Sequence, residues 1–320
     1  MAMQDSKFTS QERAWLARTK NVAFCILSFA FLTAAVLAAA GIVARAQQRP
    51  ATDNAHPELT SSPTYEVYAI RYATVRGFPV ASLVEGAERD RKLDIAMVIW
   101  LVRGNGRIVL VDSGFYREKF LQQWKPADFV KPSEVIAKLG LKPADITDLI
   151  LTHMHWDHAD GVDLFPKAKI WIQRDEFAYY TGDAWQQPRT HGGIDADDVL
   201  AVVRASTEGR LGLVNGDDQE ILPGIRCYTG GKHTWQSQYV GVSTKAGVVV
   251  LASDNLYLYE NLEKNAPIAQ TLDRASNLRA QERMRQLASK PELIVPGHDP
   301  AQFARFPKVA EGVVRIDERD

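Results

Sequence analysis

The sequence predicts a mixed α/β fold in which two β-sheets pack together and helices cover their outer faces, an αββα sandwich. Strand patterns dominate the beginning and the end of the region 64–320, with helical patterns between them. Histidine and aspartate side chains recur directly after predicted strands, where a rigid element can position them without burying their polar atoms. These two observations also predict that 64–320 is one domain with one site at the strand ends.

The composition excludes several classes of protein. The 320 residues are 46% hydrophobic and 24% charged, with a net charge of -1, which is typical of a globular protein. No block dense in lysine and arginine with interleaved aromatic residues appears, so we expect no nucleic-acid partner. Of the two cysteines, Cys25 lies in an apolar segment and leaves Cys227 alone, which excludes a disulfide framework and a cysteine-rich zinc site.

The N-terminal residues 1–46 are predicted to be a signal peptide or a membrane anchor. Basic residues precede the stretch 22–44, which carries no charge, and Ala44-Arg45-Ala46 resembles a cleavage site. The stretch is also long enough to span a bilayer. Because the positive flank precedes it, both alternatives place the rest of the chain outside the inner membrane, in the periplasm or anchored facing it. Residues 47–63, which include His56, form a polar, proline-containing linker.

The region after the linker begins with β patterns. Residues 65–75 are rich in aromatic and β-branched side chains, as in a strand. Two further strands, 93–102 and 107–111, are joined by Gly104-Asn105-Gly106, which predicts a hairpin. A short helix is expected over 132–139, with Pro132 at its start and Gly140 after its end.

The second half alternates strands and helices. We expect helices at 175–180 and 272–288, and strands at 146–151, 168–172, 224–229, 239–243, 247–252 and 292–295. Residues 181–218 show no clear pattern and would suit an insertion over a site. His191 lies in this stretch and is a candidate for reaching that site.

The most informative stretch follows the strand 146–151. It reads Thr152-His153-Met154-His155-Trp156-Asp157-His158 and holds four potential metal ligands. In extended backbone, His153 and His155 project to the same side and can share one metal ion. Asp157 and His158 follow where the chain turns, so they can contact a second ion nearby. A histidine-rich turn without metal is a poor explanation for so dense a cluster.

Three more ligand-type residues end later strands, and they complete two ligand sets. The first set is expected to be His153, His155 and His233, and the second Asp157, His158 and His298, with Asp254 bridging the two ions through its two oxygens. Imidazole and carboxylate donors favour two divalent ions, foremost zinc, with iron, manganese or cobalt as alternatives. Two such ions would convert the water between them into a hydroxide nucleophile.

The cluster and the later His, Asp and His resemble the dinuclear hydrolases of the metallo-β-lactamase superfamily. The resemblance covers about residues 65–310 and implies an αββα fold. It also implies that Asp112, in Leu-Val-Asp-Ser-Gly, orients a ligand histidine. Residues 65–74 and Asp254-Asn255-Leu256-Tyr257 are most similar to the N-acyl-homoserine lactonases. The chain departs from that group after His233, where the family commonly continues with a glycine-rich turn and another histidine.

This resemblance implies an enzyme that opens a small-molecule lactone or a related ester. One metal ion and Tyr257 would stabilise the oxyanion, and Asp157 or a water would protonate the leaving oxygen. An apolar substrate tail would lie near Phe78, Met97, Trp100, Trp156 or Trp235. The alternatives are a glyoxalase II-like thioesterase, a phosphotriesterase, or a non-catalytic protein that kept the fold. The bridging aspartate argues against a β-lactamase, and His155 argues against a redox di-iron enzyme.

Overall fold

A computed structural model describes residues 63–186, 188 and 191–318. The predicted signal or anchor segment 1–46, His56 and nearly all of the linker lie outside these residues. Within the described part of the chain, no helix has the length and apolarity needed to cross a membrane.

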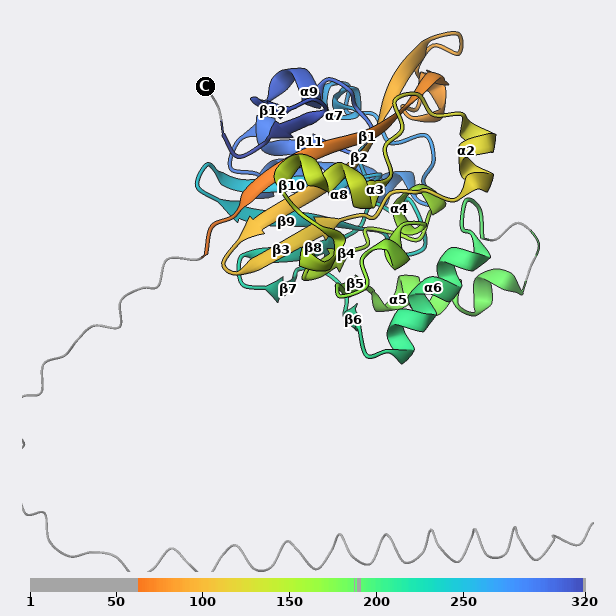
Figure 1. Ribbon diagram of the computed structural model, residues 1–320. Coiled ribbons are helices and arrows are strands. Elements are labelled where there is room, and N and C mark those ends of the chain that lie inside the picture. Colours follow the sequence, from red (N-terminus) through yellow and green to blue (C-terminus); the bar gives the residue numbers. More distant parts are fainter. Residues whose placement is uncertain (1–62, 187, 189–190, 319–320) are drawn as a thin grey trace, which may run out of the picture. The chain divides into compact units, whose positions relative to one another are not determined.

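Two β-sheets form the centre of the fold, as predicted (Figure 1). The larger sheet has eight strands in the order β12 (Lys308–Ala310), β13 (Val313–Arg315), β1 (Glu66–Pro79), β2 (Lys92–Gly104), β3 (Arg107–Val111), β4 (Asp148–Ile150), β5 (Lys169–Gln173) and β6 (Leu211–Val214). The smaller sheet has the order β11 (Ile294–Pro296), β10 (Gly247–Ser253), β9 (Gln238–Thr244), β8 (Ile225–Thr229) and β7 (Gln219–Leu222).

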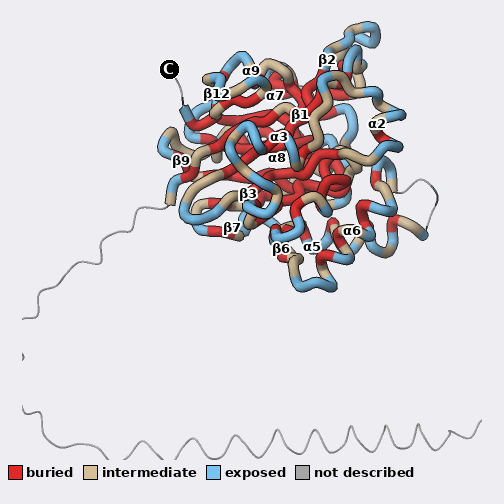
Figure 2. Tube along the Cα trace, in the orientation of Figure 1, coloured by how far each residue is buried: buried red, intermediate tan, exposed pale blue. Residues whose placement is uncertain are grey.

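The inner faces of the two sheets share one apolar core. Val98 and Trp100 of the larger sheet belong to the same buried cluster as Val240 and Val249 of the smaller one. Figure 2 shows this centre as buried strands surrounded by more exposed helices and loops. Burial of apolar surface on both sides of each sheet stabilises the layered arrangement.

Helices cover the outer faces of both sheets. The described helices are α2 (Glu118–Trp124), α3 (Pro132–Val135), α4 (Trp156–Ala159), α5 (Arg174–Tyr180), α6 (Ala196–Thr207), α7 (Tyr259–Glu263), α8 (Arg274–Leu287) and α9 (Gln302–Arg305). α3, α5 and α6 pack on the larger sheet, and α8 packs on β10 of the smaller one. Figure 1 shows α5 and α6 beside β5 and β6. The αββα prediction is therefore confirmed.

Local signals explain several element boundaries. The predicted hairpin forms between β2 and β3, because Asn105 and Gly106 adopt the positive φ angles, 49° and 70°, of a tight turn. Asp273 caps α8 by accepting a hydrogen bond from the Ser276 backbone. The helix expected over 132–139 splits into α3 and a 3-10 turn at Ile136–Leu139.

The stretch 181–218, which showed no clear pattern, contains both α6 and β6. Asp195 caps α6 by accepting a hydrogen bond from the Asp197 backbone, and Val199, Val202 and Ala205 form its buried face. The helix signal was present, but the glycine- and aspartate-rich residues around it obscured the pattern.

Strand direction places the functional residues at one edge. β3 runs parallel to β4, and β10 runs parallel to β11, so within each pair the carboxyl ends are adjacent. Asp112 follows β3, the histidine cluster follows β4, Asp254 follows β10 and His298 follows β11. The two sheets together present these residues to one site.

Candidate metal centre

Seven side chains from separate parts of the chain converge into two adjacent groups of ligand atoms. Within each group the ligand atoms lie within 4.8 Å of one another. The first group consists of His153, His155, His233 and Asp254, and the second of Asp157, His158, Asp254 and His298. The structure thus gathers all seven predicted ligands and divides them as the sequence predicted.

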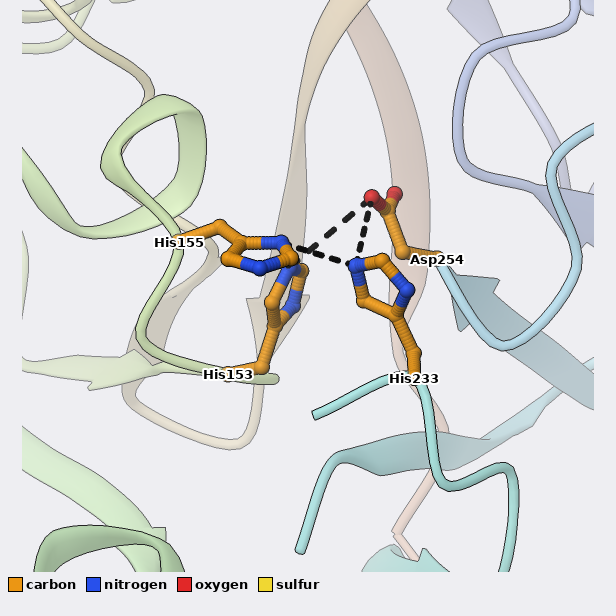
Figure 3. Close-up of side chains that lie close together, drawn as sticks. All are labelled: His153, His155, His233 and Asp254. Carbon is orange, nitrogen blue, oxygen red and sulfur yellow. Dashed lines mark hydrogen bonds and ion pairs between the residues drawn. The ribbon is translucent and has the colours of Figure 1, made fainter. Parts of the chain in front are cut away.

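Asp254 belongs to both groups, and its two oxygens face different histidines. Oδ2 lies 3.3 Å from His233 Nε2 and 3.8 Å from His153 Nε2. Oδ1 lies 3.0 Å from His298 Nε2 and 3.4 Å from His158 Nε2. Figure 3 shows the carboxylate directed toward the histidines of the first group. This geometry suits a carboxylate that bridges two cations.

Hydrogen bonds at Nδ1, the ring nitrogen that faces away from the ligand group, orient three of the histidine rings. The Nδ1 atoms face oxygen acceptors: Asp112 Oδ2 at 2.8 Å for His158, the Gln270 carbonyl at 2.8 Å for His233, and the Ala96 carbonyl at 3.0 Å for His298. Donation from Nδ1 leaves the Nε2 lone pair free and directed into the centre. Metal-ligating histidines are typically held in this way.

Asp112 connects the ligand segments at the ends of β3, β4 and β10. Besides His158, it accepts hydrogen bonds from the Thr152 amide at 2.8 Å, the Thr152 hydroxyl at 2.9 Å and the Ser253 hydroxyl at 2.9 Å. Asp112 and Ser253 both adopt left-handed backbone, with φ angles of 62° and 48°. Such conformations are uncommon outside glycine and concentrate at functional sites.

His155 faces the centre with Nδ1, whereas His153 and His233 face it with Nε2. Its Nδ1 lies 3.1 Å from His153 Nε2 and 2.8 Å from His233 Nε2, so three ring nitrogens meet at one point. Gly193 and Ile194 cover the ring: a Cβ at Gly193 would lie 3.1 Å from His155 Cδ2, and Ile194 forms a β-bridge with His155. These two residues of the 181–218 stretch therefore lie against the first ligand group. His191 stacks on Trp185 and belongs to neither ligand group.

Electrostatics differ between the two groups. Burial, together with His233, lowers the pKa of His155 to about 3, which keeps the ring neutral with its lone pair available. Burial opposes a charge on His158, but Asp254, Asp157 and Asp112 raise its pKa well above the ordinary value. Burial also opposes ionisation of Asp254, yet His298 and His158 hold its pKa well below its usual range. The centre therefore favours buried positive charge.

The donor set fits two divalent cations. His158 Nε2 and Asp254 Oδ1 are buried, and neither has a hydrogen-bond partner among the described residues. An unpartnered buried polar atom costs about 1–3 kcal/mol, and a cation between these atoms would remove that cost. Four nitrogen and oxygen donors for each position match the preferences of zinc.

An apolar pocket of about 220 Å³ opens beside the two ligand groups. Asp157, Asp254, His298 and Tyr257 form its polar end, and Phe78, Met97, Trp124 and Trp156 form much of its apolar wall. Phe78, Trp124 and Trp156 stack in sequence, with centroids 6.2 Å and 5.3 Å apart.

Two of the five aromatic or apolar residues expected near a substrate tail do not line this pocket. Trp100 is buried in the core between the sheets, and Trp235 is 43% exposed. The sequence could not distinguish these two alternatives from the other three, because an uninterrupted apolar strand and an irregular loop do not reveal which way a side chain points.

Several residues that support the centre carried no recognisable signal. The Ala96 and Gln270 carbonyls hold ligand histidines, and backbone oxygens cannot be identified from residue type. Trp124, at the end of α2, lines the pocket. Glu176 contacts two ligand-bearing loops from α5. Its position in the first turn of a helix is ordinary for a glutamate and did not predict burial.

Residues 97–298 match the family model of the metallo-beta-lactamase superfamily, and the chain belongs to that superfamily. N-acyl homoserine lactonase AiiB of Agrobacterium fabrum (strain C58) is 29% identical over 247 residues, which covers 70% of this chain and 86% of the relative. The family assignment agrees with the sandwich fold and the clustered ligands.

Solved structures share the fold. One is an N-acyl homoserine lactone hydrolase with the product N-hexanoyl-L-homoserine bound at its catalytic metal centre. It has a TM-score of 0.62 and 22% identity, and the match covers 75% of this chain and 95% of that one. Another is AidC, a dizinc quorum-quenching lactonase in complex with a product. It has a TM-score of 0.58 and 16% identity, with 74% and 88% coverage.

Proposed function

We propose that this chain is a dinuclear metallohydrolase that opens lactone rings of the N-acyl-homoserine type or closely related esters. The observation that carries the proposal is the pair of ligand groups sharing Asp254 at the end of an apolar pocket. The similarity to AiiB supports the lactone as substrate class, and the dizinc description of AidC supports zinc as the metal.

Metal ions and chain residues divide the chemistry between them. Two divalent cations held by the first and second groups would lower the pKa of water toward neutrality and polarise a carbonyl oxygen. The apolar wall around Phe78, Trp124 and Trp156 would bind the acyl group and exclude bulk water from the reacting carbonyl. The lactone ring would then lie at the polar end, near Asp157 and Tyr257.

Tyr257 is placed to donate a hydrogen bond to developing negative charge. The side chain is 3% exposed, lines the pocket, and its Oη lies 3.3 Å from His233 Nδ1. Burial, together with Asp254 and Asp157, raises the pKa of Tyr257 well above its ordinary value. The phenol therefore stays protonated and can stabilise the carbonyl oxygen as it gains charge.

Asp157 is placed to move a proton. Its Oδ2 lies 3.5 Å from His158 Nε2 and 3.7 Å from His298 Nε2, and the residue lines the pocket. Burial opposes its ionisation, but His158 and His298 lower its pKa, so the resting group is a carboxylate. It can accept the proton that the attacking water loses and pass it to the leaving ring oxygen.

A hydrolysis panel tests the substrate class. The metal-loaded protein is offered N-acyl-homoserine lactones of several tail lengths, a simple γ-lactone, a thioester, a phosphotriester and a β-lactam. We expect the highest kcat/KM on an acyl-homoserine lactone, with the ring-opened acid as product by mass spectrometry. Turnover of the thioester or the phosphotriester alone would replace the proposal with that alternative.

Substitution of Tyr257 by phenylalanine tests the proposed donor. We expect kcat on a lactone to fall by about 10²-fold, with a small change in KM, because the phenol acts mainly on charge that forms in the transition state. Tyr259→Phe is the matched control, since the buried Tyr259 hydroxyl has no partner among the described residues and the residue does not line the pocket. An unchanged kcat in Tyr257→Phe would remove Tyr257 from the mechanism.

We also propose that the protein works outside the inner membrane. The uncharged stretch 22–44 with basic residues before it supports export or anchoring. Cell fractionation checks this location, and the intact mass of the mature protein distinguishes cleavage near residue 46 from an uncleaved anchor. Recovery of the full-length chain in the cytoplasm would refute the proposal.

A further inference from the structure

Glu176 is a fully buried carboxylate whose position links two ligand-bearing loops. It lies in the first turn of α5 and is 0% exposed. It is not part of either ligand group. A buried carboxylate requires strong hydrogen bonds to offset its desolvation, so its partners indicate what it does.

Three donors from two loops bind this carboxylate. Oε1 accepts hydrogen bonds from the Met154 amide at 3.1 Å and the Thr234 hydroxyl at 2.7 Å, and Oε2 accepts one from the Gln236 amide at 2.6 Å. Met154 separates His153 from His155, and Thr234 follows His233 directly. One side chain thus binds residues adjacent to all three histidines of the first group.

The same helix holds the His233 loop in two other ways. Tyr179 stacks on Trp235 with centroids 4.0 Å apart and an angle of 9° between the rings. Tyr180 Oη accepts a hydrogen bond from the Trp235 amide at 3.4 Å. Immediately after His233 the sequence departs from the lactonase pattern. The residues found there in this chain, Thr234 to Gln236, are contacted by α5.

The second group is held by different residues. Asp112 binds the outer nitrogen of His158, and the Ala96 carbonyl binds that of His298. Glu176 contacts the 152–158 segment only at Met154, between the two histidines of the first group, and it has no hydrogen bond to Asp157, His158 or His298 themselves. Asp112 reaches both groups, because the Thr152 hydroxyl that donates to it also lies 3.0 Å from His153 Nδ1, whereas Glu176 contacts only the loops of the first group.

We infer that Glu176 is a positioning residue that fixes His153, His155 and His233 for one metal ion and has little influence on the other. The inference rests on the proposed two-metal centre, but it does not depend on the substrate. Loss of the carboxylate frees two loops, so the three imidazoles must be ordered again when the ion binds. Residues that orient ligands in this way typically contribute 10- to 100-fold to metal affinity.

Stepwise metal titration of the metal-free protein tests the inference. Wild type and Glu176→Ala are titrated with Zn²⁺ against a chromophoric chelator, and Co²⁺ spectra report the coordination of each ion. We expect Glu176→Ala to bind one ion as wild type does and the other about 10- to 100-fold more weakly. Asp175→Asn is the matched control, because Asp175 is the exposed acidic neighbour on the same helix, and it should bind both ions normally.

Two milder variants guard against misfolding of Glu176→Ala. Glu176→Gln keeps one acceptor oxygen but presents an NH₂ group to a backbone donor, and Thr234→Val removes one hydrogen bond of the three. Both variants should weaken binding of the ion that Glu176→Ala binds weakly. Glu176→Gln should weaken it more than Thr234→Val. Asp112→Asn should instead weaken binding of both ions, because Asp112 supports His158 directly and His153 through the Thr152 hydroxyl.

If Glu176→Ala and Glu176→Gln bind both ions more weakly to the same extent, or bind both as tightly as wild type, the inference is overturned. Circular dichroism of each variant confirms that the fold is retained. If wild type binds two ions but opens no lactone, the proposed substrate fails and the role of Glu176 stands. If Glu176→Gln leaves both affinities unchanged while lactone hydrolysis persists in wild type, the role of Glu176 fails and the proposed function stands.

Discussion

Replacement of Asp254 by asparagine is expected to reduce kcat/KM on a lactone by about 10³-fold or more. Each carboxylate oxygen faces a different ligand group, and the asparagine NH₂ cannot ligate a cation in place of one oxygen. The substitution also removes the negative charge common to both groups. Metal ions contribute several kcal/mol to transition-state stabilisation, and each 1.4 kcal/mol corresponds to about tenfold in rate.

Metal analysis should accompany the kinetics of this variant. Wild type is expected to retain two ions per chain after gel filtration, and Asp254→Asn fewer. Asp175→Asn, the exposed carboxylate on α5, should match wild type in both measurements. Full activity with two bound ions in Asp254→Asn would show that the aspartate does not bridge the two positions.

Removal of the metal ions is expected to abolish hydrolysis and to lower the melting temperature. Without cations, Asp112, Asp157 and Asp254 share one buried region in which imidazoles supply the compensating positive charge. An ion that binds the folded state alone stabilises it by about 2.7 kcal/mol when its concentration is 100 times Kd. Dialysis against a chelator should therefore give an inactive protein of lower Tm, and added Zn²⁺ should restore both properties.

The specificity of this effect can be checked with other ions. Co²⁺ and Mn²⁺ should restore activity to different extents, because they accept the same nitrogen and oxygen donors, whereas Mg²⁺ prefers oxygen ligands and should restore little. Undiminished lactone hydrolysis by protein that elemental analysis shows to be free of metal would contradict the proposed mechanism.

The division of the four clustered ligands between two groups could be predicted from their spacing. His153 and His155 alternate in extended chain and enter the same group, whereas Asp157 and His158 follow the turn into α4 and enter the other. The sequence could not show that His155 faces the centre with Nδ1 while His153 uses Nε2. Ring orientation depends on contacts such as that with Gly193, which come from a distant segment.

The positions of most strands along the chain could also be predicted, but the direction of individual side chains could not. β2 is apolar on both faces because one face meets the second sheet and the other meets the helices. Met97 and Trp100 lie three residues apart and therefore project to opposite faces. Only Met97 reaches the pocket, and an unbroken apolar run contains no information about which face that is.

The buried carboxylates that hold the ligand-bearing segments in place were the features of the site that were hardest to predict from the sequence. Asp112 was identified because it resembles a family residue, and the structure places its carboxylate on His158. Glu176 has the same kind of role beside the other group, yet its partners are backbone amides and a hydroxyl from distant loops. Such contacts depend on tertiary structure and leave no spacing pattern in the chain.

Anomalous diffraction from crystals of the zinc-loaded protein, recorded on both sides of the zinc absorption edge, tests the two-metal centre most directly. We predict two peaks, one among His153, His155, His233 and Asp254 and the other among Asp157, His158, Asp254 and His298. A single peak, or zinc bound away from Asp254, would contradict this account of the site.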